Sequence, residues 1–286
     1  MKSYKPTSPG RRDGSVIEYR KKLTTTKNNP YKALTKGRKQ TGGRNSAGRT
    51  TVLNRGGGNK RVYRFVDFRY DKKDIPARVE QIEYDPYRSG FIARIVFKDG
   101  ERRYILAPQT LAAGSEVVTS AQAKPVPGNR MPLGEVPLGT FIYNIELKPG
   151  AGARLVRSAG NYAEVVAHDA GYTQIKLPST EIRKVISTAW ASIGAVSNEE
   201  YRLVKIGKAG RARHMGQRPK TRGSAKNAVD HPHGGGEGRS PRGHRRARTK
   251  QGRPVGKGQK TRSPKKYSNY AIVQRRKPGR LMGGKR

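Results

Sequence analysis

The charge of this chain is concentrated at its two ends, which limits where a folded core can form. Of the 286 residues, 62 are Lys or Arg and 20 are Asp or Glu, so the formal net charge is +42. Residues 61–200 are nearly neutral, with 19 basic and 16 acidic side chains, whereas residues 1–60 carry 16 basic and 2 acidic ones. Residues 239–286 carry 18 basic side chains and no acidic one. Only the middle can bury a sizeable core, and a polyanion is the expected partner.

The basic ends are expected to form extensions rather than domains. They are rich in Gly, Pro and Ser, so apolar burial cannot offset the entropy that they lose on ordering. We expect them to stay mobile until a polyanion orders them. Helical signals are weak and amount to a turn or two within residues 198–216.

Several classes of protein are excluded by composition. The chain has no cysteine, which rules out disulfides, thiol nucleophiles and zinc sites built on thiolates. No apolar run approaches the roughly 18 residues that a membrane helix needs. Residues 1–12 lack the apolar core of a secretory signal, so we expect a soluble, unexported protein.

The middle of the chain begins with a pattern of short β-strands. Residues 91–97 (FIARIVF) place alternate apolar side chains on one face, and residues 101–107 (ERRYILA) follow after Asp99-Gly100. An Asp-Gly pair between two apolar runs predicts a β-hairpin. Further strands are predicted at residues 60–68, 77–84 and 115–120. Five short strands so close together indicate a small barrel, because closure removes exposed strand edges.

A second set of strands follows a segment rich in Pro and Gly, residues 123–139, which predicts a domain boundary. Residues 140–147 alternate apolar side chains, and residues 162–167 and 172–177 flank the turn sequence HDAG. The segments EIRKVI and ASIGAV add two strands, which indicates a second small barrel. The predicted organisation is a basic N-terminal extension (1–59), a first barrel (60–124), a second barrel (125–200) and a basic, Gly-rich C-terminal extension (201–286).

The segment VDHPHGGGEGR, residues 229–239, combines two histidines, three glycines and an acid among basic neighbours. In an enzyme, His231 would be a general base oriented by Asp230, or His231 and His233 would begin a metal site. No second acid, nucleophile or convincing further ligand accompanies them. The segment could also be an ordinary surface loop.

Binding to RNA fits the residue types of this segment best. Glycines let the main chain approach phosphates closely and present its N–H groups. Histidine can stack on bases and hydrogen-bond to phosphate or to the 2′-hydroxyl. Glu237 would accept a hydrogen bond from a base amino group or hold a neighbouring arginine, and a metal-mediated phosphate contact through Asp230 stays open.

Longer motifs occur in a fixed order along nearly the whole chain. They are KPTSPGRR (5–12), GGGNKRVYRFVDF (56–68), YDPYRS (84–89), DGERRYILAP (99–108), ARLVRSAG (153–160), GKAGRAR (207–213) and VDHPHGGGEGR (229–239). Together they resemble the ribosomal protein L2 family of the large subunit. Three residues depart from the family pattern: Asn59, where the family usually has histidine, and Lys226 and Ala228, where it has methionine and proline.

The resemblance implies an OB-fold barrel followed by an SH3-like barrel, in a mainly β protein with long, irregular basic extensions. It implies that these extensions penetrate the large-subunit ribosomal RNA near the peptidyl transferase centre, and that the protein serves subunit association and transfer-RNA binding. In the family, arginines of the DPxRS turn and of the ARSAG loop bind RNA, and they correspond here to Arg88 and Arg157. The first histidine of DHPHGGGEG, here His231, is the one most associated with ribosomal function.

We therefore expect a structural, non-enzymatic component of the large ribosomal subunit. Expected partners are the large-subunit ribosomal RNA, the small subunit across the intersubunit face and neighbouring ribosomal proteins, but no membrane. No catalytic or metal-ligating residue is predicted, and no cofactor beyond RNA-bound magnesium. The predicted RNA-binding residues are Lys60, Arg64, Arg88, Arg157, Arg213, Arg222, Asp230, His231, His233, Gly234, Gly235, Gly236, Glu237, Arg239, Arg245 and Arg246.

Two other classes of function are open to test, an enzyme that acts through His231 and a DNA-compacting protein without sequence preference. The expected location is the cytoplasmic ribosome. Because the family-like motif KPTSPGRR begins at residue 5, we expect no cleaved transit peptide and hence a bacterial or organelle-encoded protein.

Overall fold

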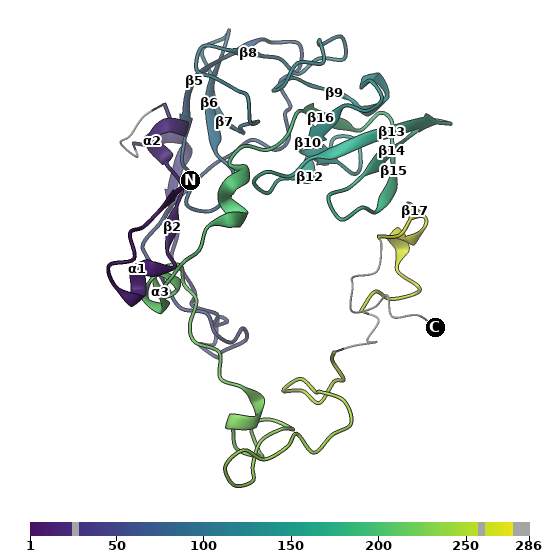
Figure 1. Cartoon of the computed structure of the whole chain (residues 1–286). Coiled ribbons are helices and arrows are strands. Elements are labelled where there is room, and N and C mark those ends of the chain that lie inside the picture. Colours follow the sequence, from purple (N-terminus) through teal and green to yellow (C-terminus); the bar gives the residue numbers. More distant parts are fainter. Residues whose placement is uncertain (25–28, 257–260, 277–286) are drawn as a thin grey trace.

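Two curled β-sheets lie side by side, and long segments of the N- and C-terminal extensions loop out from them (Figure 1). The computed structural model describes residues 1–24, 29–256 and 261–276. Strands make up most of the regular structure, which confirms the predicted mainly β class. None of the helices in these three ranges is long and apolar enough to cross a membrane.

The first barrel contains an antiparallel sheet in the order β7-β6-β5-β8. Its strands are β5 (Ala77–Glu83), β6 (Ile92–Phe97), β7 (Arg102–Leu106) and β8 (Glu116–Val117). The predicted Asp-Gly hairpin is confirmed, because Gly100 has φ +84° and its N–H donates to the carbonyl of Phe97 between β6 and β7. Alternate residues such as Val79, Ala93 and Ile95 fill the core.

The strand predicted at residues 60–68 is much shorter than expected. Only β4 (Val62–Arg64) is a strand, and its partner is β3 (Thr35–Gly37) of the N-terminal extension, just after the 3-10 turn η1 (Lys32–Leu34). Beyond β4 the chain crosses to β7, where the N–H of Asp67 donates to the carbonyl of Tyr104. The N-terminal extension therefore supplies the partner of β4, in a separate two-stranded sheet beside the first barrel, which its composition did not indicate.

The second barrel is built on an antiparallel sheet in the order β17-β15-β14-β13-β10-β16-β9. Its elements are β9 (Arg130–Pro132), η2 (Leu133–Glu135), β10 (Phe141–Tyr143), β13 (Ala163–Asp169), β14 (Tyr172–Lys176), β15 (Ile182–Ile186), β16 (Trp190–Ile193) and β17 (Ile272–Gln274), with a separate pair β11 (Ile145–Glu146) and β12 (Ala153–Leu155). The predicted β13–β14 hairpin is confirmed, with its turn at Ala170-Gly171.

The single strand predicted over residues 140–147 is wrong, because the backbone breaks at Asn144. Asn144 has φ +54° and separates β10 from β11. Its carbonyl accepts a hydrogen bond from the buried Arg130, which also pairs with Glu146 at 3.0 Å. This buried polar group holds the kink, and the predicted alternation fails at Phe141, which is 47% exposed.

The two barrels share a small core of their own. Leu106 of the first barrel packs with Tyr143 and Val196 of the second, and all three are fully buried. The hydroxyl of Tyr143 donates to the carbonyl of Leu106 at 3.1 Å. This contact fixes the barrels relative to each other and so positions the loops that lie between them.

The two extensions contact each other through their main chains. The N-terminal elements are β1 (Lys2–Ser3), α1 (Pro9–Arg12), β2 (Ser15–Val16) and α2 (Tyr19–Lys22); the C-terminal ones are η3 (Glu199–Leu203), α3 (Ala209–His214), η4 (Gly223–Ala225) and η5 (Tyr267–Asn269). Ser15 and Lys205 exchange two hydrogen bonds, and the N–H of Gly56 donates to the carbonyl of Gly216 at 2.8 Å. In Figure 1 α1 and α3 lie together, away from the barrels.

The C-terminal extension makes a wide excursion and returns to the second barrel (Figure 1). There β17 pairs antiparallel with β15, and Ala271 beside it is buried. Part of the segment predicted as an extension is therefore an edge strand of the second sheet.

Candidate nucleic-acid interface

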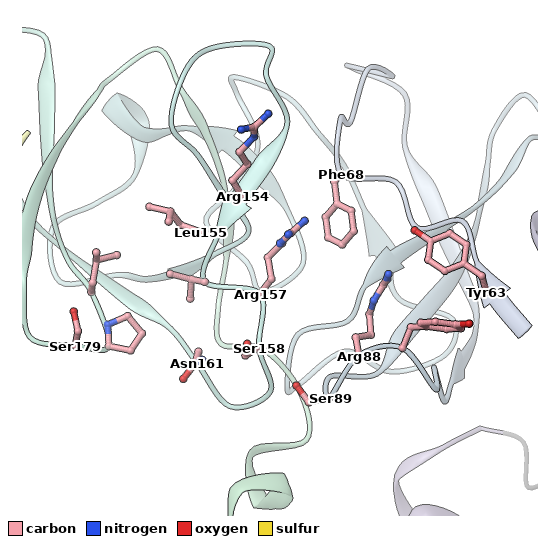
Figure 2. A pocket seen from close by; sticks show the side chains of 14 residues that line it. Tyr63, Phe68, Arg88, Ser89, Arg154, Leu155, Arg157, Ser158, Asn161 and Ser179 are labelled. Carbon is pink, nitrogen blue, oxygen red and sulfur yellow. The ribbon is translucent and has the colours of Figure 1, made fainter. Parts of the chain in front are cut away.

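A cavity of about 850 Å³ lies between the two barrels and receives side chains from both. Arg88 comes from the turn after β5 and Arg157 from the loop after β12. Figure 2 shows both guanidinium groups directed toward this space, on either side of Phe68. The structure thus brings together two predicted RNA-binding residues that are 69 positions apart in the sequence.

Phe68 is the centre of this arrangement. The guanidinium carbon of Arg157 lies 4.4 Å from the centre of its ring and that of Arg88 lies 5.3 Å away, which are cation–π distances. The carbonyl of Phe68 accepts a hydrogen bond from the N–H of Ala153 at 2.7 Å. Gly152 makes this contact possible, because it has φ +77° and an added Cβ would lie 2.8 Å from that carbonyl.

The guanidinium group of Arg88 forms an ion pair with a buried carboxylate. Asp85 is fully buried, and its Oδ2 lies 3.2 Å from Nε of Arg88 while its Oδ1 accepts from the N–H of Tyr87. The side chain of Arg88 is only 16% exposed. Its Nη1 is buried and has no hydrogen-bond partner among the described residues. Leaving a buried cationic donor without an acceptor costs free energy, so the surrounding contacts hold Arg88 in this position against that cost.

The loops that carry the two arginines are hydrogen-bonded to each other. The N–H of Ala159 donates to the hydroxyl of Ser89 at 3.1 Å, and the side-chain amide of Asn198 donates to the carbonyl of Ser89 at 2.6 Å. Burial, followed by the charges of Arg88 and Arg154, lowers the pKa of Arg157. The repulsion among these cations would be relieved by a phosphate in the cavity.

Aromatic rings extend the cavity along the first barrel. Tyr63 contacts Tyr87 and Phe65 edge to face, with ring centres 5.4 and 5.5 Å apart, and Arg61 lies over Tyr87 at 5.0 Å. Such rings offer stacking faces to unpaired bases. Sequence reasoning missed these rings, Phe68 and Arg154; the alternation of Tyr63 and Phe65 across β4 was a usable signal.

Arg64 does not lie on this surface, although we expected it to bind RNA. It is 1% exposed, and its Nη1 donates to the carbonyl of Val62 at 2.8 Å. Alternation along β4 sends Tyr63 outward and Arg64 inward, where its charge counteracts the effect of burial on the pKa of Glu83. Lys60 and Arg213 are exposed but do not line the cavity.

The histidine loop, residues 226–248, lies far from the barrels (Figure 1). Nδ1 of His231 accepts from the N–H of His233 at 3.0 Å, and Nε2 of His233 accepts from the N–H of Arg248 at 3.0 Å. Nε2 of His244 is 3.2 Å from the carbonyl of Pro232. Because they accept, the acceptor nitrogens of His231 and His233 carry no proton here.

Several glycines in and beside the histidine loop allow close packing within this region. A Cβ on Gly234 would lie 2.2 Å from the carbonyl oxygen of Asn227, and one on Gly223 would lie 2.4 Å from the ring of His231. Gly235 and Gly236 have φ +84° and +83°, which favours glycine. The loop shape is thus fixed partly by contacts that only glycine permits.

The polar residues of the histidine loop do not converge on an active site. Asp230 and Glu237 are exposed, and no group of His, Asp and Glu in the described ranges could hold a metal ion. Burial, followed by electrostatic interactions with His231, Arg242 and other neighbours, lowers the pKa of His233. The remaining predicted residues here are exposed cations: Arg222, Arg239, Arg245 and Arg246.

Comparison with known proteins gives the family. The RNA-binding N-terminal domain of ribosomal proteins L2 matches residues 31–119, and their C-terminal domain matches residues 126–252. The large ribosomal subunit protein uL2 of Granulibacter bethesdensis is 52% identical over 280 residues, which cover 98% of this chain and 99% of that protein. The uL2 protein of Roseobacter denitrificans is 52% identical over 276 residues, covering 96% and 97%. The chain belongs to the ribosomal protein L2 family.

Proposed function

We propose that this protein, a structural component of the large ribosomal subunit that binds ribosomal RNA, holds that RNA at two separate surfaces. One is the cavity between the barrels, an OB-fold barrel followed by an SH3-like barrel. The other is the histidine loop with its surrounding arginines. Its place of action is the cytoplasmic large subunit.

The convergence of Arg88 and Arg157 carries the proposal. The two side chains come from different barrels, flank one phenylalanine and leave a buried guanidinium nitrogen of Arg88 without an acceptor among the described residues. An RNA phosphate in the cavity would pair with the two guanidinium groups that converge on it, and the neighbouring tyrosines would supply stacking faces for bases. Among the described residues, the cavity is lined by cations, rings and serine hydroxyls but by no His, Asp, Glu, Cys or Lys that could activate them, which fits binding rather than turnover.

The histidine loop would support RNA rather than perform chemistry. His231 and His233 each use one ring nitrogen to accept a hydrogen bond from a main-chain N–H group. Those nitrogens are therefore not available to take a proton from a substrate. We propose that this loop and the C-terminal extension support the peptidyl transferase region and transfer-RNA binding. Contacts with the small subunit and with neighbouring ribosomal proteins belong to the same proposal.

The test is binding of the full-length chain to large-subunit ribosomal RNA over a range of salt concentrations. Arg88→Gln and Arg157→Gln should each weaken binding and reduce the slope of log affinity against log salt by roughly one phosphate contact. The control is Arg78→Gln, because Arg78 is exposed on β5 and lies outside the cavity. Equal losses in all three variants, or equal affinity for duplex DNA, would contradict the proposal.

A further inference from the structure

A second cavity, of about 450 Å³, lies where the two extensions meet the first barrel. Its lining residues come from β2 and the start of α2, from Tyr84 just after β5, and from η3, α3 and the segment between them. It shares no lining residue with the cavity between the barrels. Its volume lies within the range of roughly 300–1,000 Å³ that is usual for small-ligand sites.

The lining is mostly apolar and partly open to solvent. Tyr84, Tyr201 and Met215 are 36, 39 and 48% exposed, and Val204 and Ile206 lie between them along the C-terminal extension. Tyr19 packs edge to face against Tyr84, with ring centres 5.4 Å apart. Two aromatic rings and one thioether are therefore partly exposed at this surface.

Three of the residues that line the cavity carry hydroxyl groups. The hydroxyls of Tyr19, Tyr84 and Tyr201 have no hydrogen-bond partner in the part of the chain that the structure describes. Burial, together with the charges of Tyr84 and Tyr201, raises the pKa of Tyr19 to about 12. The hydroxyl therefore keeps its proton at neutral pH and can donate to a ligand.

The surroundings of the cavity favour an anionic ligand. Residues 1–24 and 199–216 together carry 12 basic and 4 acidic side chains. Two of those acids are already paired, Glu18 with Lys21 at 2.8 Å and Glu200 with Lys22 at 3.2 Å. An apolar pocket edged by cations is complementary to a base attached to a phosphate backbone, and much less so to an apolar peptide.

The rim is fixed before any ligand arrives. Arg211 donates to the carbonyl of Ile206 at 3.2 Å and to the hydroxyl of Tyr4 at 3.0 Å. The ring of Tyr4 has Arg11 and Arg211 as cation–π partners, at 5.3 and 5.2 Å. These contacts join the two extensions across the cavity, so little ordering cost is left for binding.

We propose that this cavity binds one unstacked nucleobase of the large-subunit ribosomal RNA, with its ring against Tyr84 and Tyr201 and its edge toward the tyrosine hydroxyls. The inference rests on the RNA binding proposed above but concerns different residues. The adjoining basic side chains of the extensions would contact the phosphates on either side of that base.

Ultraviolet cross-linking of intact large subunits, followed by mass spectrometry of the peptides, tests the proposal directly. We expect a nucleotide attached to Tyr201, His214 or Met215, all of which line the cavity. Adducts at Tyr63 or Tyr87 report separately on the cavity between the barrels. Adducts there but none at the second cavity would overturn this inference alone, whereas their absence from both would count against RNA binding at either. A polypeptide cross-linked to Tyr201 would also overturn it.

A matched pair of variants gives a quantitative test with full-length protein and large-subunit ribosomal RNA. Tyr201→Ala should weaken binding about tenfold, the loss expected for one stacked base. Because stacking releases no counterions, the salt slope should stay unchanged. The control is Leu203→Ala, in the same 3-10 helix, since Leu203 is 54% exposed and does not line the cavity. Equal affinity of the two variants would overturn the proposal.

Discussion

Arg88 and Arg157 extend from two barrels that bury their cores, whereas His231 and His233 lie in a stretch where no described residue between 199 and 267 is buried. The cavity between the barrels is fixed by packing, by the main-chain contact of Ala153 with Phe68 and by the buried Asp85. The histidine loop depends on a few hydrogen bonds between exposed groups. The cavity between the barrels is therefore preformed by the fold, whereas the histidine loop should open at far lower free energy.

The largest expected effect is at the preformed surface. Gly152→Ala would place a Cβ 2.8 Å from the carbonyl of Phe68 and force a non-glycine residue into φ +77°. We expect the free energy of unfolding to fall by about 2–4 kcal/mol, from backbone strain plus overlap. Thermal unfolding of the full-length protein measures this.

The control for that variant is Gly150→Ala, because Gly150 has φ +73° and nothing within 4 Å of an added Cβ. This variant should lower the free energy of unfolding only by the backbone strain, about 1 kcal/mol. Equal destabilisation by the two variants would show that the close approach to Phe68 is not what fixes the cavity.

The matching change at Gly223, which packs against the histidine loop, should have a local effect only. Gly223→Ala would place a Cβ 2.4 Å from the ring of His231 and displace it. The imidazole NMR signals of His231 should shift, while the unfolding temperature stays within about 1 °C of the original, because surface changes outside the core alter stability little. Gly57→Ala, with open space around it, is the control and should leave His231 unchanged. A large drop in unfolding temperature would contradict the view that the histidine loop contributes little to global stability.

The smallest expected effect is a pH dependence confined to the loop. The pKa of His233 is lowered in the folded loop, mainly by burial and then by nearby positive charges, so the neutral ring is favoured. The stabilisation is present above the ordinary pKa of about 6.5 and is lost as the pH falls through the lower folded value. Protonation removes the acceptor for the N–H of Arg248.

Hydrogen exchange measures this effect. The protection factor of the Arg248 amide should decrease between about pH 7 and pH 5, across the ordinary histidine range. The amide of Ala159, which is bonded to the hydroxyl of Ser89, is the internal reference and should keep its protection. An equal loss of protection at both amides would show that the histidine loop and the cavity between the barrels do not differ in their pH dependence.

Much of the fold could be predicted because its signals are local. The hairpin at Asp99-Gly100 and the strands on either side follow from alternation and turn chemistry within a few residues. The break at Asn144 could not be predicted, because its left-handed backbone is supported by Arg130, which comes from another strand. The pairing of β17 with β15 was missed for a similar reason, since the two are nearly 90 residues apart.

In the candidate site, too, some features could be predicted from local motifs and others could not. The family motifs identified Arg88 and Arg157 as RNA-binding candidates, but nothing in either motif indicates that both flank Phe68. Arg64 was placed on the surface because of its charge, yet its position in β4 turns it inward. The tyrosines of the second cavity lie far apart in the sequence and were not recognised as a group.

By itself, the sequence determined the charge segregation, the mainly β class, most of the strands and the family, because each depends on composition, short-range periodicity or contiguous motifs. Tertiary structure alone decided which side chains share a cavity, which arginine is buried and how the two extensions join. Those features arise from contacts between residues distant along the chain, and such contacts form only when the barrels have packed against each other.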